Sequence, residues 1–130
     1  MNSHTNSEQY NFKIDVETAY HPEQSAPEQH RYVFSYTITI RNTGKVAGKL
    51  LTRHWIITNA DGKVQEVQGE GVVGEQPHLQ PGELFRYTSG TVLETPVGSM
   101  HGSYHMLADD GIEFEADISP FTLSMPNTLH

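Results

Sequence analysis

The sequence predicts an all-β protein: an antiparallel β-sandwich of the immunoglobulin or fibronectin-III type, with about seven or more strands. Three observations support this fold class. Apolar and polar residues alternate along several segments, turn-forming glycine and proline residues separate those segments, and no segment has the apolar spacing of a helix. Alternation of this kind predicts sheets with one face in the core and one face in water. A small closed barrel is the second possibility.

The first two strands are predicted at residues 10–20 and 31–40, where apolar side chains recur at every second position. Between them, residues 21–30 contain two prolines and predict a loop. A turn at 42–44 follows the second strand. The side chains expected to face the core are Tyr10, Phe12, Ile14, Val16, Thr18, Tyr20, Tyr32, Phe34, Tyr36, Ile38 and Ile40.

The third strand is predicted at residues 49–58, and residues 63–68 form its short return strand. The turn between them, residues 59–62, ends in a glycine, which permits the positive φ that such turns need. The residues expected on the core face of the third strand are Leu51, Trp55 and Ile57, with Trp55 lying between the two sheets.

The second half of the chain contains predicted strands at residues 83–90, 99–107 and 112–118, with turns at 81–82 and 109–111. No internal repeat divides it, and no linker separates it from the first half. The side chains expected to face the core here are Phe85, Tyr87, Met100, Tyr104, Met106, Ile112, Phe114, Ala116 and Ile118.

Composition restricts the class of protein. The 130 residues predict one domain over residues 9–126, with a disordered tail at 1–8 and a short tail at 127–130. The net charge of −8 argues against a general basic field for nucleic acid or anionic lipid. Cysteine is absent, which excludes disulfides and thiolate metal sites. There is no signal-peptide pattern and no run of roughly 18 apolar residues, so we expect a cytoplasmic monomer or small homo-oligomer without a membrane span.

The segment from Gly69 to Gly74 reads G-x-G-x-x-G, the string that holds a pyrophosphate in dinucleotide-binding proteins. Gly69, Gly71 and Gly74 are therefore candidate residues for an anion-binding loop. The fingerprint works only where a helix follows the glycines, and Pro77 and Pro81 would break such a helix. The string alone is weak support for a nucleotide site.

The charges around these glycines also argue against a phosphate. No basic residue lies between Lys63 and Arg86, so an anion would meet carboxylates unless the fold brought Arg or Lys from elsewhere. Loop amides can bind anions without a helix, so an anion site stays open. The other interpretation is that the glycines permit a bulge, a tight corner or close backbone packing. The carboxylates in this interval belong to Glu66, Glu70, Glu75 and Glu83.

Eight histidines raise the question of a metal site. Two histidines of one strand share an ion most easily at positions i and i+2, about 7 Å apart, and no such pair occurs. His101 and His105 share a face but would lie roughly 13 Å apart, and His54 and His78 are possible cross-strand partners. We expect no transition-metal site and no cofactor. A hard cation would be held only loosely by exposed carboxylates of the last strand, Glu113, Glu115 and Asp117.

The sequence contains no recognisable set of catalytic residues. A G-x-S-x-G elbow and a Ser/His/Asp grouping are both absent, so Ser89 is interpreted as an ordinary hydroxyl at a strand end. We therefore expect that the protein is not an enzyme. The aromatic stripe Tyr32, Phe34 and Tyr36 predicts core packing rather than base stacking, because no basic residues accompany it. Edge strands of such a sandwich are common docking surfaces.

Six segments in this order resemble the bacterial ApaG proteins: "RYVFSYTITIRNTG", "LLTRHWIIT", "GEGVVGEQPHLQPGE", "YTSGT", "GSMHGSYHM" and "ISPFTLS". The resemblance covers about residues 10–125 and is highly specific. One departure is Asn59, where the family more often has Asp. Asn and Asp substitute readily in a hairpin turn, so the departure changes little.

The resemblance implies a fibronectin-III-like sandwich and a link with tolerance or efflux of cobalt and magnesium. Related domains in F-box proteins and in a polymerase-interacting protein look like protein-interaction modules, and no catalytic residue carries over. We therefore expect a non-enzymatic module that binds protein partners and affects divalent cations indirectly. The alternative is a small-molecule site that binds a nucleotide, a pyrophosphate or a hard divalent cation at Gly69–Gly74.

Overall fold

The computed structural model describes residues 8–126 as a sandwich of antiparallel strands, which confirms the predicted all-β fold class. The predicted tails at 1–8 and 127–130 lie, apart from Glu8, outside the described residues. Among the described residues no helix could traverse a lipid bilayer. The elements are β1 (Phe12–Tyr20), the 3₁₀ turns η1 (Pro22–Gln24) and η2 (Pro27–Gln29), β2 (Tyr32–Asn42), β3 (Gly48–Asn59), β4 (Val64–Glu70), β5 (His78–Leu79), β6 (Leu84–Leu93), β7 (Val97–Ala108) and β8 (Glu113–Ser124).

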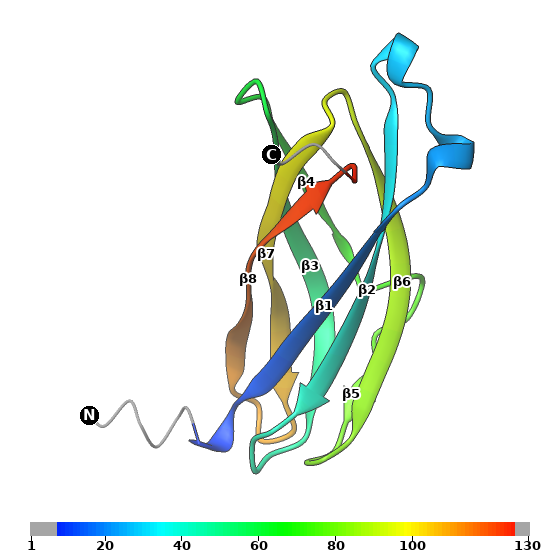
Figure 1. The fold of residues 1–130 in the computed structure, drawn as a ribbon. Coiled ribbons are helices and arrows are strands. Elements are labelled where there is room, and N and C mark those ends of the chain that lie inside the picture. The colour runs from blue at the N-terminus through cyan, green and yellow to red at the C-terminus, as the bar shows by residue number, and fades with distance from the viewer. Residues whose placement is uncertain (1–7, 127–130) are drawn as a thin grey trace.

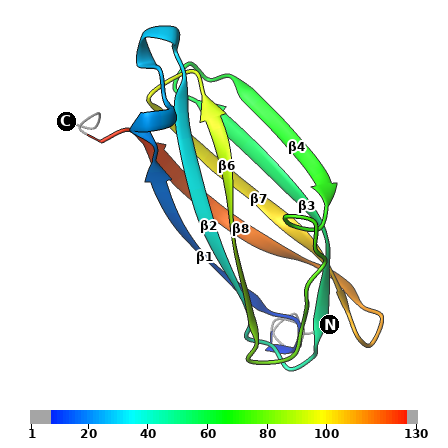
Figure 2. The same cartoon turned by 90° about the vertical axis from the view of Figure 1, so that its right-hand side faces the viewer.

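Two sheets make up the sandwich (Figure 1). The first sheet has the strand order β1-β2-β6, and the second has the order β4-β3-β7-β8, with the short β5 also pairing with β3. Every strand pair is antiparallel. In the turned view of Figure 2, β6 and β2 cross in front of the second sheet. Strands β4 and β6 are therefore edge strands of different sheets, as are β1 and β8.

The core lies between the sheets, as the alternation predicts. Trp55 is 2% exposed and makes edge-to-face contacts with Tyr36 from the facing sheet and with Tyr104 and Phe121 from its own sheet. The centroids of the Trp55 and Tyr36 rings are 5.4 Å apart, a favourable arrangement of ring quadrupoles. Burial of the stripe Tyr32, Phe34 and Tyr36 agrees with the interpretation of these residues as core.

The prediction that Leu51 faces the core was wrong. Leu50 occupies the core instead, with 1% of its surface exposed, whereas Leu51 is half-buried. The pairing of β3 with β7 shifts register between Leu50 and Thr52, which indicates a β-bulge. A bulge adds one residue to one strand and so reverses which face each preceding side chain occupies.

The last strand also differs from the prediction at both of its ends. Ile112 is 47% exposed because it precedes β8 rather than belonging to its core face. The strand continues to Ser124 although it contains Pro120. Strand β8 is at the edge of its sheet, and its pairing with β7 shifts register between Met100 and Gly102. An edge strand with a bulge can accommodate a proline, which cannot donate to a ladder.

The two sides of the sandwich differ in how they are closed. On one side β1 meets β8, and the ring of Phe12 lies 5.8 Å from that of Phe114 between centroids. The hydroxyl of Tyr10 donates to a carboxylate oxygen of Asp110 at 2.5 Å, which ties the start of β1 to the turn before β8. On the other side are β4 and β6, and the side chains between them leave open space.

Candidate functional site

The three motif glycines lie where the edge of the second sheet is interrupted. Gly69 belongs to β4, whereas Gly71 and Gly74 lie in the loop between β4 and β5. Because β4 and β5 both pair with β3, this loop is an excursion from one discontinuous edge. Val72 and Glu75 bridge to each other and enclose a tight turn, and the Val72 side chain is completely buried.

Much of the backbone of the loop is already hydrogen-bonded within the protein. The amide of Gly71 donates to the carbonyl of Leu51 at 2.8 Å, and Val72 and Glu75 exchange two hydrogen bonds of 2.7 and 2.9 Å. Within the described residues no helix follows, because β5 begins directly after Pro77. The loop therefore lacks both the helix N-terminus and several of the free amides with which a pyrophosphate cradle works.

Two of the glycines have conformations or contacts that other residues would not tolerate. Gly71 has φ +61°, and a Cβ there would lie 2.2 Å from the carbonyl oxygen of Glu75. Gly74 has φ +82° with open space around it, so only its backbone conformation favours glycine. The residue before it, Val73, also has a positive φ of 43°, which is unusual for a β-branched residue.

Gly69 makes room for an arginine that the sequence analysis missed. The guanidinium of Arg53, which comes from β3, lies directly against Gly69, and a Cβ at that position would be 2.8 Å from its Cζ atom. One terminal nitrogen of Arg53 donates to the carbonyls of Glu70 and Gly71, at 3.0 Å each. The sequence did indicate that the Arg53 side chain faces inward, because Arg53 precedes Trp55 by two residues and so lies on the same face of the strand.

The guanidinium of Arg53 is held by backbone carbonyls. No ion pair within 4 Å involves Arg53 among residues 8–126. Deeper between the sheets, the buried hydroxyls of Tyr87 and Tyr104 hydrogen-bond to each other. Burial raises the pKa of both tyrosines above the ordinary value, and the positive charge of Arg53 opposes part of that rise. Arg53 is thus a half-buried cation next to a neutral pair.

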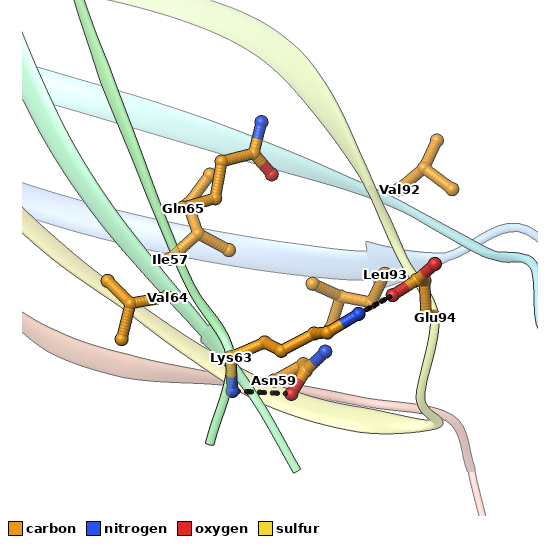
Figure 3. A pocket seen from close by; sticks show the side chains of 8 residues that line it. All are labelled: Ile57, Asn59, Lys63, Val64, Gln65, Val92, Leu93 and Glu94. Carbon is orange, nitrogen blue, oxygen red and sulfur yellow. Dashed lines mark hydrogen bonds and ion pairs between the residues drawn. The ribbon is translucent and has the colours of Figure 1, made fainter. Parts of the chain in front are cut away.

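A groove runs between β4 and β6 on this side of the sandwich. It consists of two adjoining hollows of about 240 Å³ each, which share Ile57 and Gln65 in their walls. At one end, the ammonium of Lys63 lies 3.5 Å from a carboxylate oxygen of Glu94 and spans the two sheets (Figure 3). At the other end lies Arg53. We call this feature the β4–β6 groove; its remaining walls are formed by Tyr36, Trp55, Asn59, Val64, Val67, Ser89, Gly90, Thr91, Val92 and Leu93.

The outer face of the second sheet carries the histidines and carboxylates considered as metal ligands. His105 is hydrogen-bonded by both ring nitrogens, to Glu115 and Glu113. Hydrogen bonding to Glu115 and then to Glu113 raises the pKa of His105 above its ordinary value. His54 pairs with Glu66 on the neighbouring strand. Each imidazole is thus engaged with carboxylates of its own face.

The other predicted ligands do not assemble around a common point. His54 lies opposite Ser103 of β7 and bonds Glu66, and His78 bonds Asp109 at 2.7 Å, so neither bonds His101 or His105 across the strands. No group of three or more His, Asp or Glu side chains in the described part of the chain is arranged to hold a metal ion. Ser89 lines the groove, but within residues 8–126 no hydrogen bond links it to a histidine or a carboxylate. The sites predicted from sequence therefore remain separate.

Comparison with known proteins identifies the family. Residues 22–108 match the family model described as the ApaG domain. The chain belongs to the ApaG family. It is 60% identical over 126 residues to Protein ApaG of Methylobacillus flagellatus, covering 97% of this chain and 99% of the relative. It is 59% identical over 122 residues to Protein ApaG of Pseudomonas aeruginosa, covering 94% of this chain and 97% of the relative.

Solved structures agree with this assignment. A crystal structure of a Bordetella pertussis protein described as ApaA superimposes with a TM-score of 0.90 at 51% identity, covering 93% of this chain and 98% of that one. The C-terminal domain of wzt superimposes with a TM-score of 0.55 at 11% identity, covering 94% of this chain and 77% of that chain. The second likeness concerns the fold alone. The resemblance found in the sequence is thereby confirmed.

Proposed function

We propose that this ApaG-family chain is a non-enzymatic, cytoplasmic binding module that acts through protein partners. Its effect on divalent cations such as cobalt and magnesium would then be indirect, through the partner. The observation that supports this proposal is the β4–β6 groove. Among the described strands, two sheet edges without a further partner flank a hollow with mixed polar and apolar walls, and Arg53 at one end forms no ion pair within 4 Å there. Free sheet edges and mixed walls with an arginine are features of protein-binding surfaces.

The two sides of the sandwich support the choice of this surface. A fold that needed only stability would gain from filling the space between β4 and β6 with apolar side chains, as Phe12 and Phe114 do on the other side. Here Val64 and Val92, on the outer faces of β4 and β6 beside the groove, are 64% and 44% exposed. They add apolar area on both edges of the groove for a partner to cover.

The proposal is tested by affinity capture from cells grown with and without cobalt. The bait is the full chain or the variant Val92→Lys, which places a charge on the rim of the groove. Ile112→Lys is the matched control, because Ile112 is exposed to a similar extent, 47%, but lies in the turn before β8. A partner retained by the chain and by the control but lost with Val92→Lys supports the proposal. Captures without any specific partner in both media contradict it.

A second candidate function is an anion site beside Gly69, and the position of Arg53 favours it. Tertiary structure brings a guanidinium against the glycine motif, which the local sequence does not supply. The engaged amides of Gly71, Val72 and Glu75 argue against it. An amide-resolved NMR titration separates the two candidates: saturable shifts at residues 69–76 with ATP or a dinucleoside tetraphosphate would establish the anion site. Shifts with Mg²⁺ or Co²⁺ alone would instead indicate a cation site at the nearby carboxylates.

A further inference from the structure

The edge of β6 that faces away from β2 has main-chain groups available for pairing. The amide and carbonyl of Val33 bond to the hydroxyl of Ser25 and to the amide of His21, on the side of β2 away from β6. Val33 is opposite Val92, so this pair does not exchange ladder hydrogen bonds.

Antiparallel pairs alternate between bonded and non-bonded, so the pair of Ser35 and Gly90, two residues further along, is also non-bonded. The amide and carbonyl of Gly90 therefore point toward the free edge. Strand β6 pairs with β2 alone among the described strands.

Gly90 also leaves this edge physically open. Gly90 is exposed and lines the groove. A Cβ added at this position would have the carbonyl oxygen of Phe34, at 3.2 Å, as its nearest neighbour. Glycine inside a strand often marks a site where another backbone approaches closely. The side chains of Ser89 and Thr91, on either side, turn into the groove and present hydroxyls there.

The walls of the groove indicate the chemistry of an occupant. At one end Arg53 offers a guanidinium without a carboxylate partner, which favours an acidic side chain on the ligand. Toward the other end Ile57 and Leu93 supply the apolar part of the wall, whereas Val64 and Val92 are exposed on the outer faces of β4 and β6. From Lys63 to Gly69 the groove wall formed by β4 spans roughly 20 Å, the length of about six extended residues.

We propose that the β4–β6 groove binds an extended peptide segment of a partner, which pairs as an added strand with the free edge of β6 and places an acidic side chain on Arg53. This inference rests on the proposed protein-binding function and specifies its mode. Main-chain hydrogen bonds to β6 supply affinity, and alternate side chains of the segment enter the groove. Arg53 selects segments with Asp or Glu at the position that reaches it.

A set of capped synthetic peptides tests this mode directly. In each peptide one aspartate replaces a residue of an alternating valine–threonine sequence about eight residues long, with lysines at both ends for solubility. Matched peptides carry asparagine in place of aspartate. Fluorescence polarisation gives the affinities for the full chain, and amide-resolved NMR gives the location. We expect shifts at residues 88–93 of β6 and affinity about tenfold higher for one aspartate register than for its asparagine match.

Two pairs of variants separate the contributions. Gly90→Pro removes the free amide and should weaken every peptide strongly, whereas Gly90→Ala adds a Cβ to the open edge but keeps that amide and should weaken them less. Arg53→Gln should abolish the preference for aspartate over asparagine while the shifts at β6 remain. Because Arg53 also holds the carbonyls of Glu70 and Gly71, Arg53→Lys provides a second variant that retains a charge and should keep the preference.

Several results would overturn the inference. The free-edge pairing is contradicted if Gly90→Pro and Gly90→Ala bind the peptides equally well. It is also contradicted if the peptides shift no amide signals, or only signals on other surfaces. An aspartate preference that is unchanged in Arg53→Gln contradicts the role of Arg53. Shifts produced at the groove by citrate or pyrophosphate but by no peptide would identify a small anion instead. Concentration-dependent shifts of the chain alone at β6 would indicate a second copy. A cellular partner captured equally by Gly90→Pro and by the unchanged chain would leave the protein-binding function standing and reject only this mode.

Discussion

The two lateral sides of this sandwich are closed to different degrees, although the same kind of strand forms both. On the side where β1 meets β8, the ring of Phe114 contacts the rings of both Tyr10 and Phe12. On the side of β4 and β6, a cation and several hydroxyls line open space. Dense packing contributes to stability, whereas an open, polar-lined groove contributes recognition. The difference teaches that the edges, rather than the sheet faces, distinguish the closely packed side of this fold from the open side for which we propose binding.

The largest expected effect comes from emptying the closed side. Phe12 is 7% exposed and packs against Phe114 and Gly48, so Phe12→Ala should lower the free energy of unfolding by about 3–4 kcal/mol through lost burial and a residual cavity. The comparison variant on the open side, Thr91→Ala, should cost less than about 1 kcal/mol. Urea unfolding followed by tryptophan fluorescence measures both. Equal losses would show that the two sides do not differ in packing.

The next largest effect concerns the loop that continues from β4 on the open side. Gly71→Ala should cost about 2–3 kcal/mol, because a Cβ would clash with the Glu75 carbonyl and the residue must also keep φ +61°. Gly74→Ala, with φ +82° but open space, should cost about 1 kcal/mol. Thermal unfolding of both variants tests this order. A reversed order would mean that loop rearrangement, not the contact with Glu75, determines the cost.

Periodicity predicted the sheets well but could not place the open side. The alternation around Trp55 predicted the core face correctly for the C-terminal part of β3 but not for the residues before Thr52. The bulge between Leu50 and Thr52 reverses the faces there and has no sequence signature. Arg53 was overlooked for a related reason. A charged residue at a core-facing position breaks the apolar alternation, so the pattern gives it no role. Only the fold shows that Gly69 lies beside Arg53 and leaves room for the guanidinium.

The position of the candidate site depends on which edge strands of the two sheets lie next to each other, and this is determined by the topology. The sequence interval around the motif contains carboxylates and no basic residue, and that local count argued against a cradle made by the loop alone. It could not reveal that β4 and β6, adjacent in space on one side, enclose a groove with Arg53 at its end. Residues from four different strands meet there, and the pattern of a single strand carries no information on such contacts.

A smaller effect is expected in the interior, where the two sheets are linked by the hydroxyls of Tyr87 and Tyr104. Tyr104→Phe should cost about 1–2 kcal/mol, because it leaves the Tyr87 hydroxyl buried without its partner. The double replacement by Phe should cost less than the sum of the single ones, since no unpaired hydroxyl remains. A double-mutant cycle by urea unfolding measures the coupling. Strict additivity would show that the hydroxyl pair contributes no specific link behind the groove.

The smallest expected effect lies on the exposed face of the second sheet, outside both sides compared above. Hydrogen bonds to Glu115 and Glu113 raise the pKa of His105 above the ordinary 6.5, so the folded chain binds this proton more tightly than the unfolded chain. The resulting stabilisation is fully present below about pH 6.5 and disappears as the pH rises through the raised pKa of the folded state.

His105→Gln should remove this pH dependence, with little change in stability above that window, because the site is largely exposed and screened by solvent. An NMR titration of the His105 ring, combined with urea unfolding between pH 5 and pH 9, provides the measurement. A ring that titrates at or below the ordinary value would contradict the assignment of these carboxylates as its partners. Binding of the groove peptides should be unaffected by His105→Gln, because His105 lies on the outer face of β7 and Arg53 on the inner face of β3.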